Sequence, residues 1–323
     1  MPTYPKSDHC DGSKFYNLKD PIGNSLWAGA KMIASARFEK WPDYVRNSPS
    51  PNLNSALNHD EVAITFVNHA TVLVQTASFN FLTDPVWSDR VSPLTWAGPK
   101  RHRDPGITFA ELPRIDLVLI SHNHYDHLDL DTLKRLNERF HPRFIVPLGN
   151  QTFLGSQGIS NLTELDWWQS TETGPDSKVS LAPAEHFSGR SPFDKNKTLW
   201  GSFVISFGGH SINFGGDTAY APHFTAIRER YGTPDIAFLP IGAYDPRWFM
   251  KAIHTNPDEA VQAHLDLGAR QSIGIHFGTF QMTGEKIDQP VTDLAIALQT
   301  RKLDENQFIV LGEGQTRIFQ LST

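Results

Sequence analysis

The sequence predicts an α/β protein built as a four-layer αβ/βα sandwich, in which helices cover the outer faces of two stacked sheets. Short β-rich runs recur from Glu61 onward and outnumber the helical segments. Several of these runs are apolar throughout, which is typical of strands buried on both faces. The helical segments lie between the runs, which favours mixed layers around a shared core.

The strands of the first half are expected to begin with a small antiparallel meander. A continuous apolar run then predicts a strand buried on both faces, followed by a helix and another short strand. The meander strands are 62–66, 71–75 and 80–83, the buried strand is 115–120, the helix is 130–139, and the last strand is 144–147.

The second half adds five apolar runs that are predicted strands, at 179–182, 198–207, 211–214, 236–239 and 272–275.

A helix is predicted between the last two of these strands, at 257–267. Asn256 can cap it, Pro257 occupies its first position, and Gly268 ends it.

The composition supports a substantial core and excludes some classes of protein. The 323 residues allow two domains or one large domain, and 39% are hydrophobic, which excludes a disordered or fibrous chain. The 29 basic and 35 acidic residues give a net charge of −6 with no basic run, so no nucleic-acid partner is expected. The single cysteine, Cys10, excludes an internal disulfide and an all-cysteine zinc site.

The chain shows no sign of a membrane span or of a targeting segment. The first 14 residues are polar and interrupted by proline, and no stretch reaches the ~18 apolar residues that a membrane span needs. A cytoplasmic location is therefore expected, with peripheral membrane contact left open.

Residues 1–58 are predicted to form an N-terminal arm, and residues 59–323 the main domain. The arm is rich in proline and ends in a linker-like stretch at 47–55. Inside it, apolar residues at helical spacing predict an amphipathic helix that begins near Leu26 and stops before Pro42.

The apolar face of this helix is expected to pack on the protein's own core. The alternative is an interfacial helix that touches lipid, with basic residues near the headgroups. The apolar face comprises Leu26, Ile33, Phe38 and Trp41, and the basic residues are Lys31, Arg37 and Lys40.

The strongest chemical signal is the segment Ser121–Leu128, which directly follows the buried strand 115–120. It holds His122, His124, Asp126 and His127 within six residues. Residues two apart in an extended segment point to the same side, so the first two histidines can face one ion while the other two side chains face a second. Imidazole and carboxylate suit zinc and its first-row neighbours. A merely histidine-rich surface loop is the weaker interpretation.

Further candidate ligands follow other predicted strands. His186 follows strand 179–182, Asp217 follows strand 211–214 after two glycines, and His276 follows strand 272–275. Ligands cluster at the carboxyl ends of strands in α/β folds, so these side chains are expected to converge with the loop after strand 115–120.

The spaced set from His122 to His276 resembles the metallo-β-lactamase superfamily. Four further segments resemble a narrower family within it, the N-acyl-phosphatidylethanolamine-hydrolysing phospholipase D and its bacterial relatives. These segments are Asn80–Ser88, Leu199–Ser202, Pro240–Tyr244 and Met250–Ala260.

The resemblance implies the metallo-β-lactamase fold for residues 59–323 and two zinc ions, which manganese or iron could replace. It implies that one ion is held by His122, His124 and His186, the other by Asp126, His127 and His276, with Asp217 bridging both.

The resemblance also implies roles beside the metals. Asp126 and His254 are the candidate catalytic residues, and Asp84 is expected to orient a ligand through a hydrogen bond. For His254 the alternative is a role in capping the helix that starts near Asn256.

The implied activity is that of a zinc-dependent phosphodiesterase of phospholipase D type. It would cleave N-acyl-phosphatidylethanolamine-like lipids by attack of a hydroxide held between two metals on phosphorus. A phospholipid or a small-molecule ester is the expected partner.

Several alternatives remain open. One is a carbonyl hydrolase of the same fold, such as a lactonase, a thioesterase or, least favoured, a β-lactamase. Another is a metal-binding scaffold without turnover. A nuclease is disfavoured by the acidic balance, and oxygen-reactive diiron proteins of this architecture place a glutamate where His124 stands.

The remaining histidines and loop aromatics have weaker signals. His69 is expected to be a structural hydrogen-bonding residue, His210 to be exposed in a Gly-Gly turn, and His223 is a minor candidate for lining the site. An aromatic rim around an acyl chain, or simple anchoring of loops on the core, would account for Trp87, Tyr244, Trp248 and Phe249.

Overall fold

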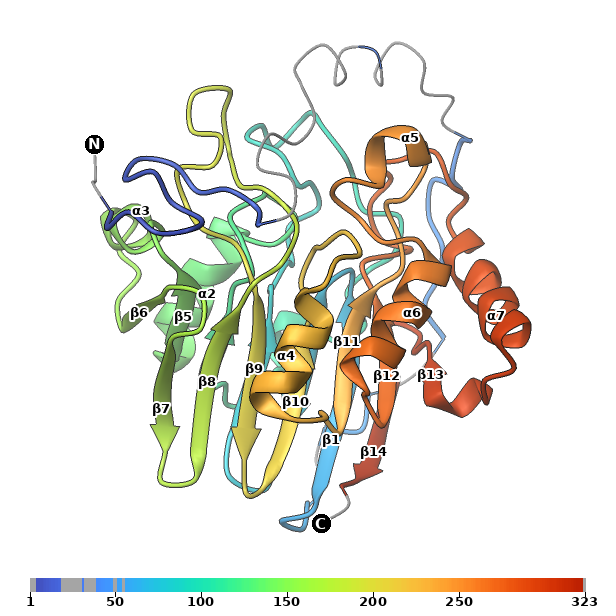
Figure 1. The fold of residues 1–323 in the computed structure, drawn as a ribbon. Helices are drawn as coiled ribbons and strands as arrows, with labels where there is room; N and C mark the ends of the chain where they lie inside the picture. Colours follow the sequence, from blue (N-terminus) through green and yellow to red (C-terminus); the bar gives the residue numbers. More distant parts are fainter. Residues whose placement is uncertain (1–3, 19–30, 32–38, 49–50, 54–55, 322–323) are drawn as a thin grey trace.

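The computed structural model describes residues 4–18, 31, 39–48, 51–53 and 56–321. Within these residues, two mixed sheets of seven strands each lie against one another, and helices cover their outer faces (Figure 1). The predicted four-layer αβ/βα sandwich is confirmed.

The first sheet has the order β14-β1-β2-β3-β4-β5-β6. The strands from β14 to β3 are antiparallel, as the predicted meander requires, and those from β3 to β6 are parallel. Its strands and adjoining helices are β1 (Glu61–Asn68), β2 (Thr71–Gln75), β3 (Asn80–Thr83), β4 (Leu117–Leu119), α2 (Leu130–Phe140), β5 (Arg143–Pro147), α3 (Gln151–Ser156), β6 (Leu162–Leu165) and β14 (Thr316–Gln320).

The second sheet has the order β13-β12-β11-β10-β9-β8-β7 and is likewise antiparallel at one side and parallel at the other. Helices α4 and α6 lie over its outer face (Figure 1). Its elements are β7 (Ser170–Gly174), β8 (Ser177–Ala182), β9 (Ser202–Phe207), β10 (His210–Phe214), α4 (His223–Tyr231), β11 (Ile236–Pro240), α5 (Arg247–Met250), α6 (Pro257–Leu267), β12 (Gln271–Ile275), α7 (Gln289–Arg301) and β13 (Phe308–Ile309). Short 3-10 turns occupy Phe109–Glu111 and Glu305–Gln307.

Alternation along the strands of the first sheet explains why both of its faces are covered. In β2, Val72 and Val74 point into the core between the sheets, whereas Leu73 points to the opposite face. There it packs in a second cluster with Leu133 and Leu136 of α2. Because successive strand residues face opposite sides and both sets are apolar, the sheet is stable only between two layers.

Local signals fix the helix that precedes β12. The side chain of Asn256 accepts a hydrogen bond of 2.8 Å from the backbone N–H of Glu259. The side chain of Glu259 accepts one from the backbone N–H of Asn256, which completes a capping box. Gly268 ends the helix in the left-handed conformation. The predicted helix 257–267 is therefore found with its predicted boundaries.

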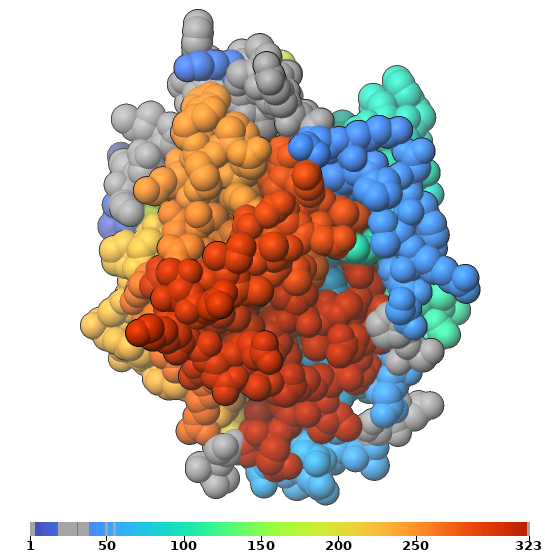
Figure 2. Space-filling model, turned by 90° about the vertical axis from the view of Figure 1, so that its right-hand side faces the viewer, coloured from blue at the N-terminus to red at the C-terminus, as the bar shows by residue number. Residues whose placement is uncertain are grey.

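Parts of the N-terminal region contact the domain. Phe15 is fully buried, and its N–H donates to the carbonyl of Asn196. Trp41 is buried and donates from Nε1 to the carbonyl of Glu285 at 2.8 Å. Residues 39–48 run along the side of the molecule beside the C-terminal elements (Figure 2). Of the helix predicted before Pro42, the structure describes only Lys31 and the residues after position 38. The other residues of that helix lie outside the described part of the chain.

The prediction of a strand at 198–207 was too long at its beginning. β9 begins only at Ser202, because backbone N–H groups before it donate hydrogen bonds to loops of the first sheet. The N–H of Leu199 donates to the carbonyl of Leu148, and the N–H of Gly201 to that of Ser121. This segment thereby ties the second sheet to the loop that holds the histidine-rich motif.

None of the described helices has the length and apolar character to cross a bilayer.

Candidate metal centre

The predicted metal ligands meet where loops that follow several strands come together. Asp84 follows β3, the His122–His127 loop follows β4, and His186, Asp217 and His276 follow β8, β10 and β12. All of these side chains are buried apart from His124, which is half-buried. Both sheets thus contribute ligand-type side chains to one place, as the sequence predicts.

The first group consists of His122, His124 and His186. Nε2 of His122 lies 2.8 Å from Nδ1 of His124, which in turn lies 3.3 Å from Nε2 of His186. One ligand atom from each residue lies within 4.8 Å of the other two. Three ring nitrogens this close face one point, where a single cation would meet all of them.

The second group consists of Asp126, His127, His276 and, in addition, His69. Nε2 of His127 lies 3.2 Å from Oδ2 of Asp126, and Nε2 of His276 lies 3.5 Å from the same oxygen. Nε2 of His69 lies 3.0 Å from it and forms a hydrogen bond. Sequence reasoning gave His69 a structural role only, because a lone histidine in a turn carries no motif.

Asp217 lies between the two groups. Its Oδ2 is 3.1 Å from Nε2 of His276 and 3.2 Å from Nε2 of His127, both in the second group. The same oxygen is 3.7 Å from Nε2 of His186 and 3.9 Å from Nε2 of His122, both in the first group. One carboxylate within reach of both sets is the arrangement expected of a bridging ligand.

The close approach of backbones at this point requires glycine. Gly216 has φ +58°, and a Cβ added there would lie 2.6 Å from the Cβ of Ser121. Asp217 can therefore reach the loop after β4 only because the preceding residue has no side chain.

Backbone conformation is also unusual at three non-glycine residues of the centre. His69, Asp84 and His276 have φ of 47°, 34° and 62°, in the left-handed region. This region costs a non-glycine residue roughly 1–2 kcal/mol, and such strain persists where surrounding structure holds it, commonly at functional sites.

Hydrogen bonds fix which ring nitrogen of each histidine faces the centre. Nδ1 of His127 donates to Oδ2 of Asp84 at 2.6 Å, and Nδ1 of His186 donates to the carbonyl of Ile253 at 2.9 Å. Asp84 is itself held by the N–H of Ser121 at 2.7 Å. The Nε2 atoms of both histidines are thereby left to face Asp217. The expected hydrogen bond from a ligand-type histidine to Asp84 is present.

His254 faces the same point from the loop after α5. Its ring lies 5.1 Å from that of His186 and 5.2 Å from that of His276, centroid to centroid, and its Nδ1 lies 3.9 Å from Oδ2 of Asp217. The capping alternative is wrong, because Asn256 caps α6.

The four loop aromatics divide between anchoring and exposure. Tyr244 is buried and donates to Asp293, and Trp87 donates from Nε1 to the carbonyl of Ile107, so both anchor loops on the core. Phe249 packs beside the centre, in a small apolar cluster with Met250 and Ile253. Trp248 is 52% exposed. The rim interpretation therefore fits only the last two aromatics.

Two other histidines were considered in the sequence analysis, His210 and His223. His210 is buried between Asp60 and Asp235, each 3.6 Å away, so its predicted exposure in the Gly-Gly turn is wrong. His223 is buried, and its Nε2 contacts Oγ1 of Thr218 at 3.2 Å, one residue from Asp217.

The comparisons with known proteins agree with this geometry. Residues 79–277 match the Beta-lactamase superfamily domain. The chain is 40% identical over 281 residues to the N-acyl-phosphatidylethanolamine-hydrolyzing phospholipase D 1 of Caenorhabditis elegans, covering 83% of this chain and 79% of that protein. The chain belongs to this phospholipase D family of the beta-lactamase superfamily. The prediction of a hydrolase of this superfamily is confirmed.

Solved structures show the same fold at lower identity. Igni18, a metallo hydrolase from Ignicoccus hospitalis, superposes with a TM-score of 0.60 at 20% identity, covering 81% of this chain and all of that one. CmlA, a diiron beta-hydroxylase from Streptomyces venezuelae, superposes with a TM-score of 0.60 at 24% identity, covering 82% of this chain and 55% of that one.

The beta-lactamase fold implies a divalent metal, and the side chains of the centre fit one. Among the described residues, buried atoms without a hydrogen-bond partner include Nε2 of His127, Nε2 of His276, Oδ1 of Asp217 and Nδ1 of His254. Buried polar atoms are normally paired, because an unpaired one costs free energy. A cation between the two groups would satisfy several of them at once.

The pKa values of the centre are shifted by burial and by its two carboxylates. Burial lowers the pKa of His124 to about 3, so its ring is neutral and offers a lone pair. Burial would raise the pKa of Asp217, but the neighbouring His127 and His276 outweigh it and hold that pKa well below its usual range. Burial would lower the pKa of His276, but Asp217 and Asp126 raise it to about 9. Asp217 and Asp126 thus hold a proton on the His276 ring, and a metal cation bound at that nitrogen would replace this proton.

Proposed function

We propose that this chain is a zinc-dependent phosphodiesterase of phospholipase D type that hydrolyses N-acyl-phosphatidylethanolamine-like lipids. One zinc would be held by His122, His124 and His186, and the other by Asp126, His127 and His276, with Asp217 shared. We further propose that residues 59–323 form the catalytic domain and residues 1–58 an arm packed on it.

The observation that carries the proposal is the position of Asp217 Oδ2. It lies within 3.9 Å of ring nitrogens from both histidine groups, which supports two cations sharing one carboxylate rather than one isolated ion. The 40% identity to the Caenorhabditis elegans phospholipase D supports the choice of substrate.

When bound, two such ions would stabilise charge on a phosphoryl group and lower the pKa of bound water to about 7. The side chains around them have separate tasks. Asp84 keeps His127 in one orientation, and Ile253 does the same for His186 through its carbonyl. Asp126 and Asp217 supply the negative charge that holds cations in a buried site.

His254 is the candidate catalytic residue that is not a predicted ligand. Burial lowers its pKa well below the ordinary value, so the ring is neutral and carries one proton. A neutral imidazole beside the centre can donate a hydrogen bond to a phosphoryl oxygen as charge develops there, or pass its proton to the leaving oxygen. Hydrolysis of the phosphodiester at the headgroup side would release phosphatidic acid and an N-acylethanolamine.

Apolar side chains beside the centre support a substrate with acyl chains. The ring of Phe187 lies 4.4 Å from that of His124, and Phe187 and Phe249 both pack against the buried cluster that contains Met250. Phe249 in turn contacts the exposed Trp248, with 5.7 Å between ring centroids. This apolar path from a predicted ligand to the surface would suit peripheral contact with a lipid layer.

A hollow of about 910 Å³ lies beside the His122–His127 loop. Asn123 and Tyr125 line it, whereas none of the seven predicted ligands does. Asn123 and Tyr125 lie between predicted ligands in the chain, and their side chains face this hollow rather than the centre. This hollow is therefore separate from the metal centre.

The test is a substrate panel on the zinc-loaded protein. A phosphodiester such as bis-p-nitrophenyl phosphate should be hydrolysed in preference to a γ-lactone, a thioester and nitrocefin. Incubation with N-acyl-phosphatidylethanolamine in vesicles should release phosphatidic acid. Turnover of the lactone or thioester alone would instead indicate a carbonyl hydrolase. Activity only with iron and oxygen would indicate the chemistry of the diiron relatives.

A further inference from the structure

His69 makes three contacts with residues of the second group. Its Nε2 lies 3.0 Å from Oδ2 of Asp126. Its carbonyl accepts a 2.7 Å hydrogen bond from the N–H of His276, and the two rings lie 4.1 Å apart, centroid to centroid. It therefore links a side chain that follows β4 in one sheet to a side chain that follows β12 in the other.

The position of His69 in the chain does not itself call for histidine. The residue lies in the turn between β1 and β2 with φ 47°, a conformation that favours glycine or asparagine. Its own N–H is held by Oγ1 of Thr279 at 2.9 Å, and the ring is almost fully buried. A strained turn that nonetheless carries a large polar ring points to a task for that ring.

We propose that His69 is a positioning residue that fixes Asp126 through its ring and His276 through its carbonyl. The Nε2–H donates to Oδ2 of Asp126, which selects one orientation of that carboxylate. The carbonyl fixes the backbone of His276 at the point where it leaves β12. Two ligands on different sheets thereby keep one common geometry. The inference rests on the metal centre of the proposed function and not on the identity of the substrate.

The contacts favour positioning over direct coordination by His69. Asp126, His127, His276 and Asp217 already offer the four donors of a tetrahedral site. A hydrogen bond from Nε2 to a carboxylate requires the proton on that nitrogen, and a protonated ring nitrogen has no lone pair for a metal.

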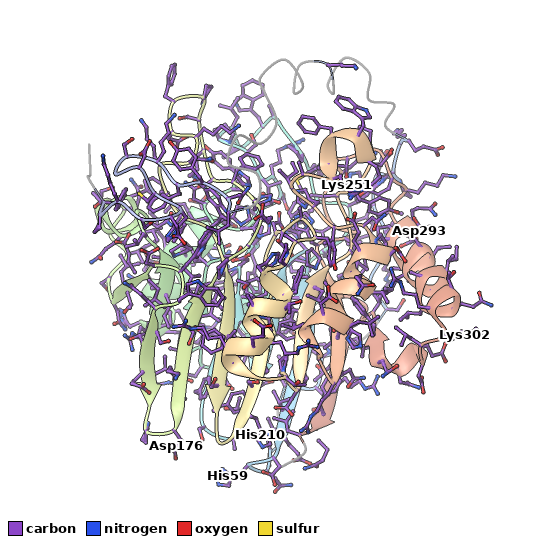
Figure 3. All side chains as sticks on the ribbon, viewed as in Figure 1. His59, Asp176, His210, Lys251, Asp293 and Lys302 are labelled. Carbon is purple, nitrogen blue, oxygen red and sulfur yellow. The ribbon has the colours of Figure 1, made fainter. Side chains whose placement is uncertain are left out.

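The experiment compares His69→Leu, which removes the donor, with His69→Gln, whose amide can donate in its place. His210→Leu is the matched control, since His210 is also a buried histidine at a hairpin turn facing carboxylates. It lies near His59 and Asp176, at the end of the molecule opposite Lys251, which follows α5 (Figure 3). Thermal unfolding of each variant checks that it is folded.

Metal affinity is measured by chelator competition, and the visible absorption of the cobalt-substituted protein reports ligand geometry. At saturating metal, His69→Leu should still hold two ions, bind one of them about 10–100-fold more weakly, and shift the cobalt absorption. His69→Gln should recover most of the affinity, and His210→Leu should match the unaltered protein.

Two results would overturn the inference. In the first, His69→Leu matches the unaltered protein in affinity and spectrum. In the second, His69→Leu and His69→Gln both lose one ion even at saturating metal, which would make His69 a ligand. An unaltered protein that bound no divalent ion would contradict both the proposed function and this inference. If only the inference is wrong, the unaltered protein still binds two ions.

Discussion

Replacing Asp217 by asparagine should disable metal binding while leaving the fold intact. The substitution keeps the size and shape of the side chain but removes the charge that lies between the two histidine groups. Oδ2 of Asp217 lies 3.1 Å from Nε2 of His276 and 3.2 Å from Nε2 of His127. A cation bound by these nitrogens would therefore lie within ~3 Å of the carboxylate.

The size of the effect follows from these distances. Two unit charges about 3 Å apart at an effective dielectric constant of ~20 interact by about 5 kcal/mol. Since ~1.4 kcal/mol corresponds to a tenfold change in affinity, Asp217→Asn should weaken metal binding by about 10³-fold or more. At a limiting metal concentration, the rate of hydrolysis should fall by at least the same factor.

Chelator competition with the purified protein measures this change directly. Asp235→Asn is the matched control, because Asp235 is a buried aspartate 3.6 Å from a histidine, His210, at the far end of the sheets. Retention of two ions by Asp217→Asn with an affinity within ~10-fold of the unaltered protein would refute the electrostatic reasoning.

Three further predictions follow from other contacts. His254→Gln should lower kcat by about 10²–10⁴-fold with both metals retained, and an unchanged kcat would remove His254 from the chemistry. Trp248→Ala should raise the KM for lipid in vesicles about tenfold and leave a soluble phosphodiester unaffected, and equal effects on both substrates would contradict a role in lipid contact. Burial opposes but Asp166 and Asp8 raise the pKa of His9, so its contribution to stability should be complete below pH ~6.5 and be lost as pH rises through the higher folded-state pKa. Urea unfolding across this range should show that fall in the unaltered protein and not in His9→Gln.

The parts of the centre that could be predicted from the sequence are those that local pattern specifies. The loop His122–His127 follows a buried apolar strand, and its ligand spacing is visible without the fold. His186, Asp217 and His276 could be added because each directly follows an apolar run, and carboxyl ends of strands meet at one edge. The boundaries of α6 were predictable because Asn256 and Gly268 mark them.

Other features depend on contacts between distant segments, which the sequence does not display. His69 has neighbours in Asp126 and His276 only because the two sheets face each other. His210 was predicted to be exposed from its glycine neighbours, yet Asp60 and Asp235 cover it. The strand β7 was missed because its residues are polar and half-exposed, without an apolar alternation.

The central claim is that both histidine groups hold divalent cations that share Asp217. Crystals grown with zinc and measured above the zinc absorption edge test it most directly, through anomalous difference density. The account predicts two peaks, one among His122, His124 and His186 and one among Asp126, His127 and His276, with Asp217 between them. A single peak, or peaks away from these side chains, would contradict it.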